Sequence, residues 1–203
     1  MRRVQVSVQP KPDDLAVRAA NDPDVFVQLY NAYFQRVYRY TFYRCGDQPT
    51  AEDLTGQVFE RLLVSISRYS PQKGPFEAWL FAMARNVVND HYRRQRFPWL
   101  PWESFRQQPA REPSPEELSI QQEALDELKS ALQRLDRRSL DLVSLKFFAR
   151  LTNRQIAGMV HMSESGVGVA LFRAVSRLRK WLGEKEGQGL TGCSEKELED
   201  ERA

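Results

Sequence analysis

The stretch from Gly74 to Arg96, GPFEAWLFAMARNVVNDHYRRQR, holds the residues best suited to contact a polyanion. On a helical wheel of about 100° per residue, polar side chains gather on one arc: Arg85, Asn89, Tyr92 and Arg96, with Asn86 and Arg93 at its margin. Guanidinium forks, amides and an aromatic ring are the groups that nucleic-acid-binding surfaces offer to phosphates and bases. No acid of this stretch lies on that arc. A solvated polar face remains the alternative on these residues alone.

The opposite arc of the same stretch predicts a buried face. It contains Phe76, Trp79, Leu80, Met83, Val87 and His91. We expect His91 to be a packed ring rather than a catalyst, and Asp90, beside this arc, to pair with an arginine.

A second candidate nucleic-acid surface lies in LTNRQIAGMVHMSESGVGVALFRAVSRLRKWL, residues 151–182. Thr152 and Gln155 form a capping box over a short helix, and Ser163 is placed to cap the next one. Two helices joined by a short break are typical of a helix-turn-helix. On the helical wheel, the residues of the second helix that are expected to be buried are Val167, Leu171, Ala174, Leu178 and Trp181. Those expected to be exposed are Ser165, Val169, Phe172, Arg173, Ser176 and Lys180.

Helical periodicity elsewhere predicts the elements that carry these surfaces. Apolar residues recur at three- and four-residue spacing from Asp24 to Arg44, and again along Ala51, Leu54, Val58, Leu62 and Ile66. We expect Thr50 to cap that second helix. Five prolines interrupt residues 97–115. The prediction is an all-α fold: a helical domain over 13–96, a Pro-rich linker over 97–115, a helix-turn-helix domain over 116–182, and an acidic tail over 183–203.

Composition excludes several classes. The tail holds seven acids and three bases, so residues 1–182 carry a net charge of +7 within an overall +3. A basic body favours a polyanionic partner. The two cysteines form no metal or disulfide pattern, and no nucleophile–base pairing or phosphate loop indicates an enzyme. We therefore expect no metal, no cofactor and no catalysis. Without a signal peptide or a membrane-length apolar run, the protein is expected to be cytoplasmic, with no membrane insertion.

The motifs on both sides of the linker resemble those of bacterial RNA polymerase sigma factors of the extracytoplasmic function (ECF) group. The first domain contributes AEDLTGQVFERLL, RYSP and the 74–96 stretch, and the second contributes LVSLKFFARLTNRQIAGMVHMSESGVGVALFRAVSRLR. With the linker, the resemblance covers about residues 24–182. It implies a sigma-2-like and a sigma-4-like domain, with core RNA polymerase (largest-subunit clamp helices and flap) and promoter DNA as partners. Such factors commonly have an anti-sigma partner.

The resemblance also implies roles for particular residues. Those on the polymerase-binding helix are Glu52, Asp53, Leu54, Gln57 and Glu60. Those at the −10 element, where the duplex opens, are Tyr69, Ser70, Gln72, Lys73, Arg85, Asn86, Asn89, Tyr92, Arg93, Arg94 and Arg96. Those at the −35 element are Arg154, Ser163, Glu164, Ser165, Val169, Phe172, Arg173 and Arg177.

The chain departs from the family pattern at several of these places. Gly56-Gln57 stands where Gln-Glu is common, which removes one acidic polymerase contact. The second helix of the helix-turn-helix commonly carries one basic residue near position 168 and another near position 170 in this family, but this chain has Gly168 and Ala170. His161 replaces the glycine that is usual in the turn between the two helices. We therefore expect weaker −35 reading than polymerase binding. A helix-turn-helix regulator without sigma activity is the alternative function, and transcription with purified core polymerase distinguishes the two.

Overall fold

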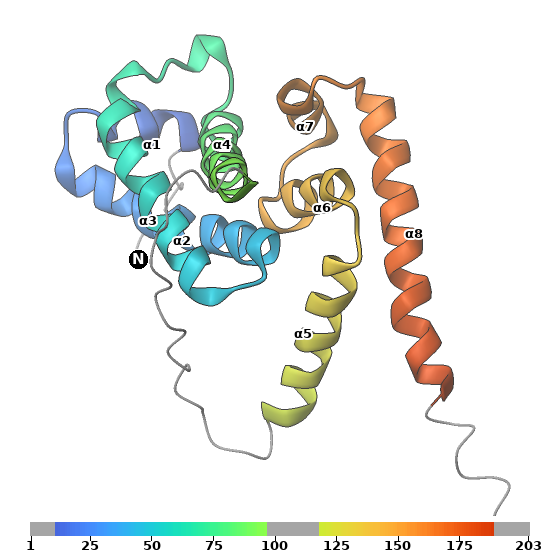
Figure 1. Cartoon of the computed structure of the whole chain (residues 1–203). Helices are drawn as coiled ribbons and strands as arrows, with labels where there is room; N and C mark the ends of the chain where they lie inside the picture. Colours follow the sequence, from blue (N-terminus) through green and yellow to red (C-terminus); the bar gives the residue numbers. More distant parts are fainter. Residues whose placement is uncertain (1–10, 97–117, 189–203) are drawn as a thin grey trace, which may run out of the picture.

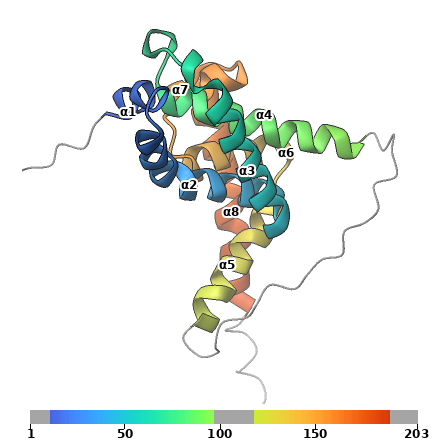
Figure 2. The same cartoon turned by 90° about the vertical axis from the view of Figure 1, so that its left-hand side faces the viewer.

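The computed structural model describes residues 11–96 and 118–188, and every regular element in this part of the chain is helical (Figures 1 and 2). The all-α prediction is therefore confirmed for the described ranges. The predicted linker over 97–115 and most of the acidic tail lie outside them.

Four helices form the N-terminal unit: α1 (Pro12–Ala19), α2 (Pro23–Cys45), α3 (Gln48–Ser65) and α4 (Phe76–Arg96). Two single 3₁₀ turns, Ile66–Arg68 and Pro71–Lys73, join α3 to α4. The start of α3 corrects one expectation, because Asp47 is its N-cap and accepts a hydrogen bond from the Thr50 amide at 2.9 Å. Proline at position 49 suits the first turn of a helix, so the helix begins before Thr50.

The C-terminal unit contains α5 (Leu118–Gln133), α6 (Arg137–Val143), a π-helical turn (Ser144–Phe148), α7 (Asn153–Val160) and α8 (Glu164–Gln188). The predicted capping box is present, with Thr152 and Gln155 bonded reciprocally, and Ser163 Oγ accepts from the Gly166 amide at 3.0 Å. His161 adopts a left-handed φ of 54°, the conformation for which glycine is usually chosen. The helix-turn-helix is therefore confirmed at the level of α7 and α8.

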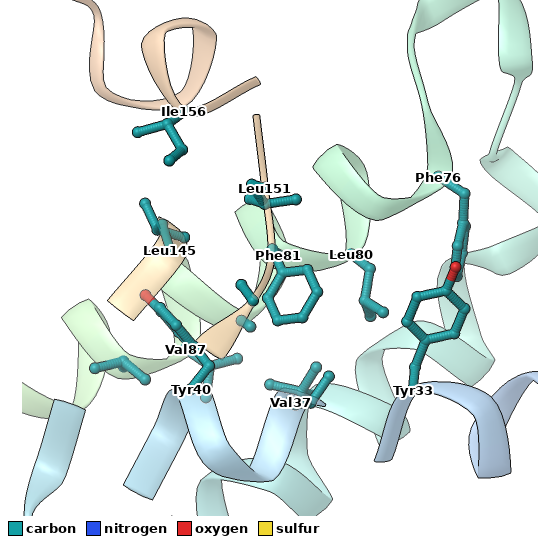
Figure 3. Packing of buried hydrophobic residues seen from close by; sticks show 14 of the residues in the cluster. Tyr33, Val37, Tyr40, Phe76, Leu80, Phe81, Val87, Leu145, Leu151 and Ile156 are labelled. Atoms are coloured by element: carbon teal, nitrogen blue, oxygen red, sulfur yellow. The ribbon is translucent and has the colours of Figure 1, made fainter. Parts of the chain in front are cut away.

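One hydrophobic core runs through both units. Figure 3 shows Tyr40 of α2 and Phe81 of α4 close to Leu145, Leu151 and Ile156 of the C-terminal unit. Phe81 is fully buried although the wheel did not place it on the core arc. The helix buries a wider arc than one domain requires, because a second domain packs on its other side. The two predicted domains therefore pack against each other over the described residues, and we call this arrangement the closed form.

Candidate nucleic-acid interface

A buried carboxylate on α6 holds the two units together. The Asp141 residue is 6% exposed and receives three groups from the N-terminal unit. The Tyr40 hydroxyl donates to Oδ1 at 3.2 Å, and Arg85 Nε donates to Oδ2 at 2.7 Å. Arg44 Nε lies 3.3 Å from Oδ1, within ion-pair distance but without hydrogen-bond alignment. Burial raises the pKa of Tyr40 far above its ordinary value, so the hydroxyl stays protonated and able to donate.

Further contacts join the N-terminal and C-terminal units, and we call this contact surface around Asp141 the seam. Arg36 on α2 donates to the Ala149 carbonyl at 2.5 Å and pairs with Glu77 at 2.5 Å. The rings of Tyr43 and Phe148 stack with centroids 3.8 Å apart. The seam thus combines ionic, hydrogen-bonded and aromatic contacts.

Part of the polar arc predicted on α4 makes contacts within the protein, across the seam for Arg85 and inside the N-terminal unit for Asn89 and Tyr92. Arg85 bonds Asp141, Asn89 accepts a hydrogen bond from Arg44 at 3.3 Å, and the Tyr92 hydroxyl donates to the Arg44 carbonyl. The acid that this arc lacks within its own helix is supplied by α6, across the domain boundary. Three members of the predicted −10 surface are therefore engaged internally in this closed form.

Other members of the predicted −10 surface face solvent. Asn86, Arg93 and Arg94 are exposed, while the side chain of Arg96 is outside what the structure describes. Asp90 pairs with Arg61 at 3.8 Å and with Arg93 at 3.2 Å, so the expected arginine pairing is confirmed. Burial lowers the pKa of the half-buried His91, which favours the neutral ring.

The loop before α4 forms a pocket of about 220 Å³. Its lining includes Arg68, Tyr69, Ser70, Lys73 and Trp79. The Tyr69 hydroxyl donates to Asp13 Oδ1 at 2.5 Å and to the Gly74 carbonyl at 3.2 Å, and Trp79 lies 5.4 Å from the Tyr69 ring.

The hydrogen-bonded loop and the aromatic rings of Tyr69 and Trp79 make the pocket suitable for a single unstacked base. The backbone of Gly74 has a φ of 139°, which a side chain rarely adopts, so the loop shape depends on glycine there. Lys73 and the predicted contact Gln72 are exposed at this loop.

The predicted −35 surface forms one exposed face of the helix-turn-helix. Its exposed members are Arg154, Ser163, Glu164, Ser165, Val169, Phe172, Arg173 and Arg177. Phe172 and Val169 are 72% and 50% exposed, which is high for apolar side chains. The Arg177 guanidinium already has partners within the protein, since its Nη2 donates to Ser139 Oγ at 2.8 Å and lies 3.3 Å from Asp136 Oδ2. The wheel prediction for the buried side of α8 is confirmed for Val167, Leu171, Ala174 and Leu178, while Trp181 is half-buried.

The predicted polymerase-binding residues divide into two groups on α3. Glu52, Asp53 and Glu60 are exposed and Gln57 is half-buried. Leu54 is 1% exposed and belongs to the core, so its side chain presents no surface to a partner in this conformation.

Two exposed apolar residues near this face were not predicted from the sequence. Leu63 and Val64 are 59% and 74% exposed at the end of α3. A consecutive apolar pair outside the core stripe was the signal that could have found them.

Two other site types are not seen in the described ranges. No group of three or more potential metal ligands occurs among the residues with described positions. No described helix has the length and apolar character needed to span a membrane.

Two protein families match parts of this chain. Sigma-70 region 2 matches residues 29–97, and sigma-70 region 4 matches residues 125–178. The ECF RNA polymerase sigma factor BldN of Streptomyces coelicolor is 35% identical over 172 residues, which are 83% of this chain and 65% of BldN. The chain therefore spans slightly less than two thirds of that relative. The ECF RNA polymerase sigma factor ShbA of Streptomyces griseus is 33% identical over 132 residues, 63% of this chain and 69% of ShbA.

A solved structure has a similar fold. The sigma factor RpoE, in its complex with the anti-sigma factor NepR from Bartonella quintana, has a TM-score of 0.59 and 19% sequence identity. The similarity covers 78% of this chain and 96% of RpoE. At this identity the comparison concerns the fold alone.

Proposed function

Because the chain belongs to the ECF group of sigma-70 RNA polymerase sigma factors, we propose that it binds core RNA polymerase and directs promoter-specific initiation. The observation that carries this proposal is the presence of both sigma regions on one chain, at residues 29–97 and 125–178. A helix-turn-helix regulator needs only the second region. The first region therefore favours sigma activity over the alternative of a plain DNA-binding regulator.

Polymerase binding is assigned to the outer face of α3. Glu52, Asp53 and Glu60 present acidic groups to solvent, with Gln57 beside them. Leu63 and Val64 add exposed apolar area on the last turn of the same helix. Exposed charges around an apolar contact are typical of protein interfaces, where charge sets orientation and rate of association. The partner surfaces in this proposal are the clamp helices of the largest subunit for α3 and the flap for the C-terminal unit.

Recognition of the −10 element is assigned to the pocket before α4 and to the polar arc of α4. The pocket lined by Tyr69, Ser70 and Lys73 would receive one extruded base. Unstacking a base costs a few kcal/mol, which phosphate contacts from Arg93 and Arg94 help to offset. Arg85 joins these contacts only after it leaves Asp141 of the C-terminal unit, whereas Asn89 and Tyr92 are held by Arg44 within the N-terminal unit. Separation of the two units is therefore part of the proposed mechanism.

Recognition of the −35 element is assigned to the exposed face of α7 and α8. Phe172 and Val169 suit thymine methyl groups, and Arg173 suits a phosphate or a guanine edge. The short supply of hydrogen-bonding groups early in α8 predicts modest sequence discrimination there. In this proposal the protein performs no bond chemistry, uses no cofactor, and acts in the cytoplasm with the polymerase. An anti-sigma factor is a further expected partner, since the similar RpoE fold was solved with one.

Transcription with purified core polymerase tests the proposal. Full-length protein added to core enzyme and a genomic template should produce transcripts with defined start sites, and core enzyme alone should not. Sequence-specific DNA binding without any such transcript would support the regulator instead.

A further inference from the structure

A cavity of about 340 Å³ lies in the seam, lined by residues of α2, α4, α6 and α7. Its size falls within the range of about 300–1,000 Å³ that is usual for small-ligand sites. Both units contribute to its lining: Arg44, Arg85 and Asn89 from one, and Arg137, Arg138, Asp141, Leu142 and Val160 from the other.

The charges around this cavity do not balance. Four guanidinium groups face a single carboxylate. Both oxygens of Asp141 are already used, Oδ1 by Tyr40 and Arg44 and Oδ2 by Arg85. Among the described residues, neither Arg137 nor Arg138 makes an ion pair. An excess of positive charge around one cavity favours a bound counter-anion.

A further donor at the cavity supports the same conclusion. The buried Arg44 Nε lies 3.3 Å from Asp141 Oδ1, so that carboxylate holds the Arg44 guanidinium in place. Asn89 uses its Oδ1 to accept from Arg44, which leaves its amide nitrogen available as a donor. Arg137 is positioned near these groups because its guanidinium lies 4.5 Å over the Tyr92 ring.

We propose that this seam cavity is a binding site for a free phosphate-rich anion, of the kind carried by nucleoside di- and triphosphates. Arginine forks match phosphate oxygens in pairs, and the excess of three positive charges matches a multiply charged ligand. The arginines come from opposite units, so the anion binds the closed form and stabilises it. Resting on the proposed function, this makes the anion a competitor of promoter DNA for Arg85 and Asn89.

Calorimetry with inorganic tripolyphosphate and the full chain tests this proposal. Titrations at constant ionic strength should show saturable binding and a raised melting temperature. The double variant R137Q/R138Q changes two exposed residues and should weaken binding about tenfold or more, equivalent to about 1.4 kcal/mol. The matched control R18Q/R39Q removes the same charge from exposed positions on α1 and α2 and should bind like the original protein.

Three outcomes would overturn the proposal. One is the absence of saturable tripolyphosphate binding. Another is an equal loss in R137Q/R138Q and R18Q/R39Q, which would indicate only general attraction between charges. The third is that single-stranded DNA, but not tripolyphosphate, depends on Arg137 and Arg138, since the cluster would then be a DNA contact. None of these readouts requires polymerase, so failure here leaves the sigma activity to be judged separately.

Discussion

Arg85 on α4 and Asp141 on α6 form an ion pair of 2.7 Å that joins the two units of the chain. The same arginine lies in the proposed −10 surface. One guanidinium cannot hold the buried carboxylate and a promoter phosphate with the same donor. In this conformation Arg85 Nε is therefore unavailable for the phosphate contact that the proposed −10 role assigns to this residue.

Replacing Asp141 by alanine should loosen the closed form. Removal of one partner of a buried ion pair typically costs about 3–5 kcal/mol, and we expect the lower end because Arg85 is 26% exposed. The measurements are the radius of gyration by X-ray scattering, which should rise, and the urea midpoint, which should fall. The exposed D126N on α5 is the control and should change neither. An unchanged radius for D141A would show that the seam does not depend on this carboxylate.

Alanine at Arg85 or Asn86 should impair strand opening more than polymerase association. Loss of one charged or amide contact should reduce open-complex formation about tenfold, equivalent to about 1.4 kcal/mol. Permanganate footprints report the melted bubble, and gel filtration with core polymerase reports association. Asn86 is the cleaner variant, because it is exposed while Arg85 also holds the seam. Unchanged footprints in both variants would remove these residues from the proposed −10 surface, with R39A as control.

The cap of α6 should make stability depend on acid pH. Hydrogen bonds from Ser139 lower the pKa of Asp136 to about 2, from an ordinary value of 3.8. A lowered folded-state pKa stabilises the fold above the ordinary value, and this contribution disappears as the pH falls through about 2. D136A should therefore cost about 1 kcal/mol at pH 7, as for a lost N-cap. Urea unfolding at pH 7 and pH 2 should show that difference shrink; a constant difference would contradict the cap.

Cys45 should react slowly with alkylating reagents. Burial raises the pKa of its thiol to about 11, so almost no thiolate exists at pH 8. In a C193S background, iodoacetamide labelling should be much slower for the folded protein than in urea. Labelling at equal rates would contradict the partial burial of Cys45 at the end of α2.

The local features of this fold were predictable, and its long-range features were not. The capping box of Thr152 and the buried stripe of α8 follow from periodicity and capping rules that act within a few residues. Asp141 as the partner of Arg85 could not be predicted, because 56 residues separate them and a helical wheel shows one helix only. Leu54 was placed both in a core stripe and at the polymerase face, and its burial supports the stripe.

Opening of the seam at the promoter can be measured directly as a change in distance between the two units. Spin labels at two exposed positions, S67C beside α3 and S130C on α5, report the separation of the units after Cys45 and Cys193 are changed to serine. Electron paramagnetic resonance should show one distance for the protein alone and a longer one in the open complex with core polymerase and promoter. An unchanged distance in a complex that makes transcript would contradict opening of the seam.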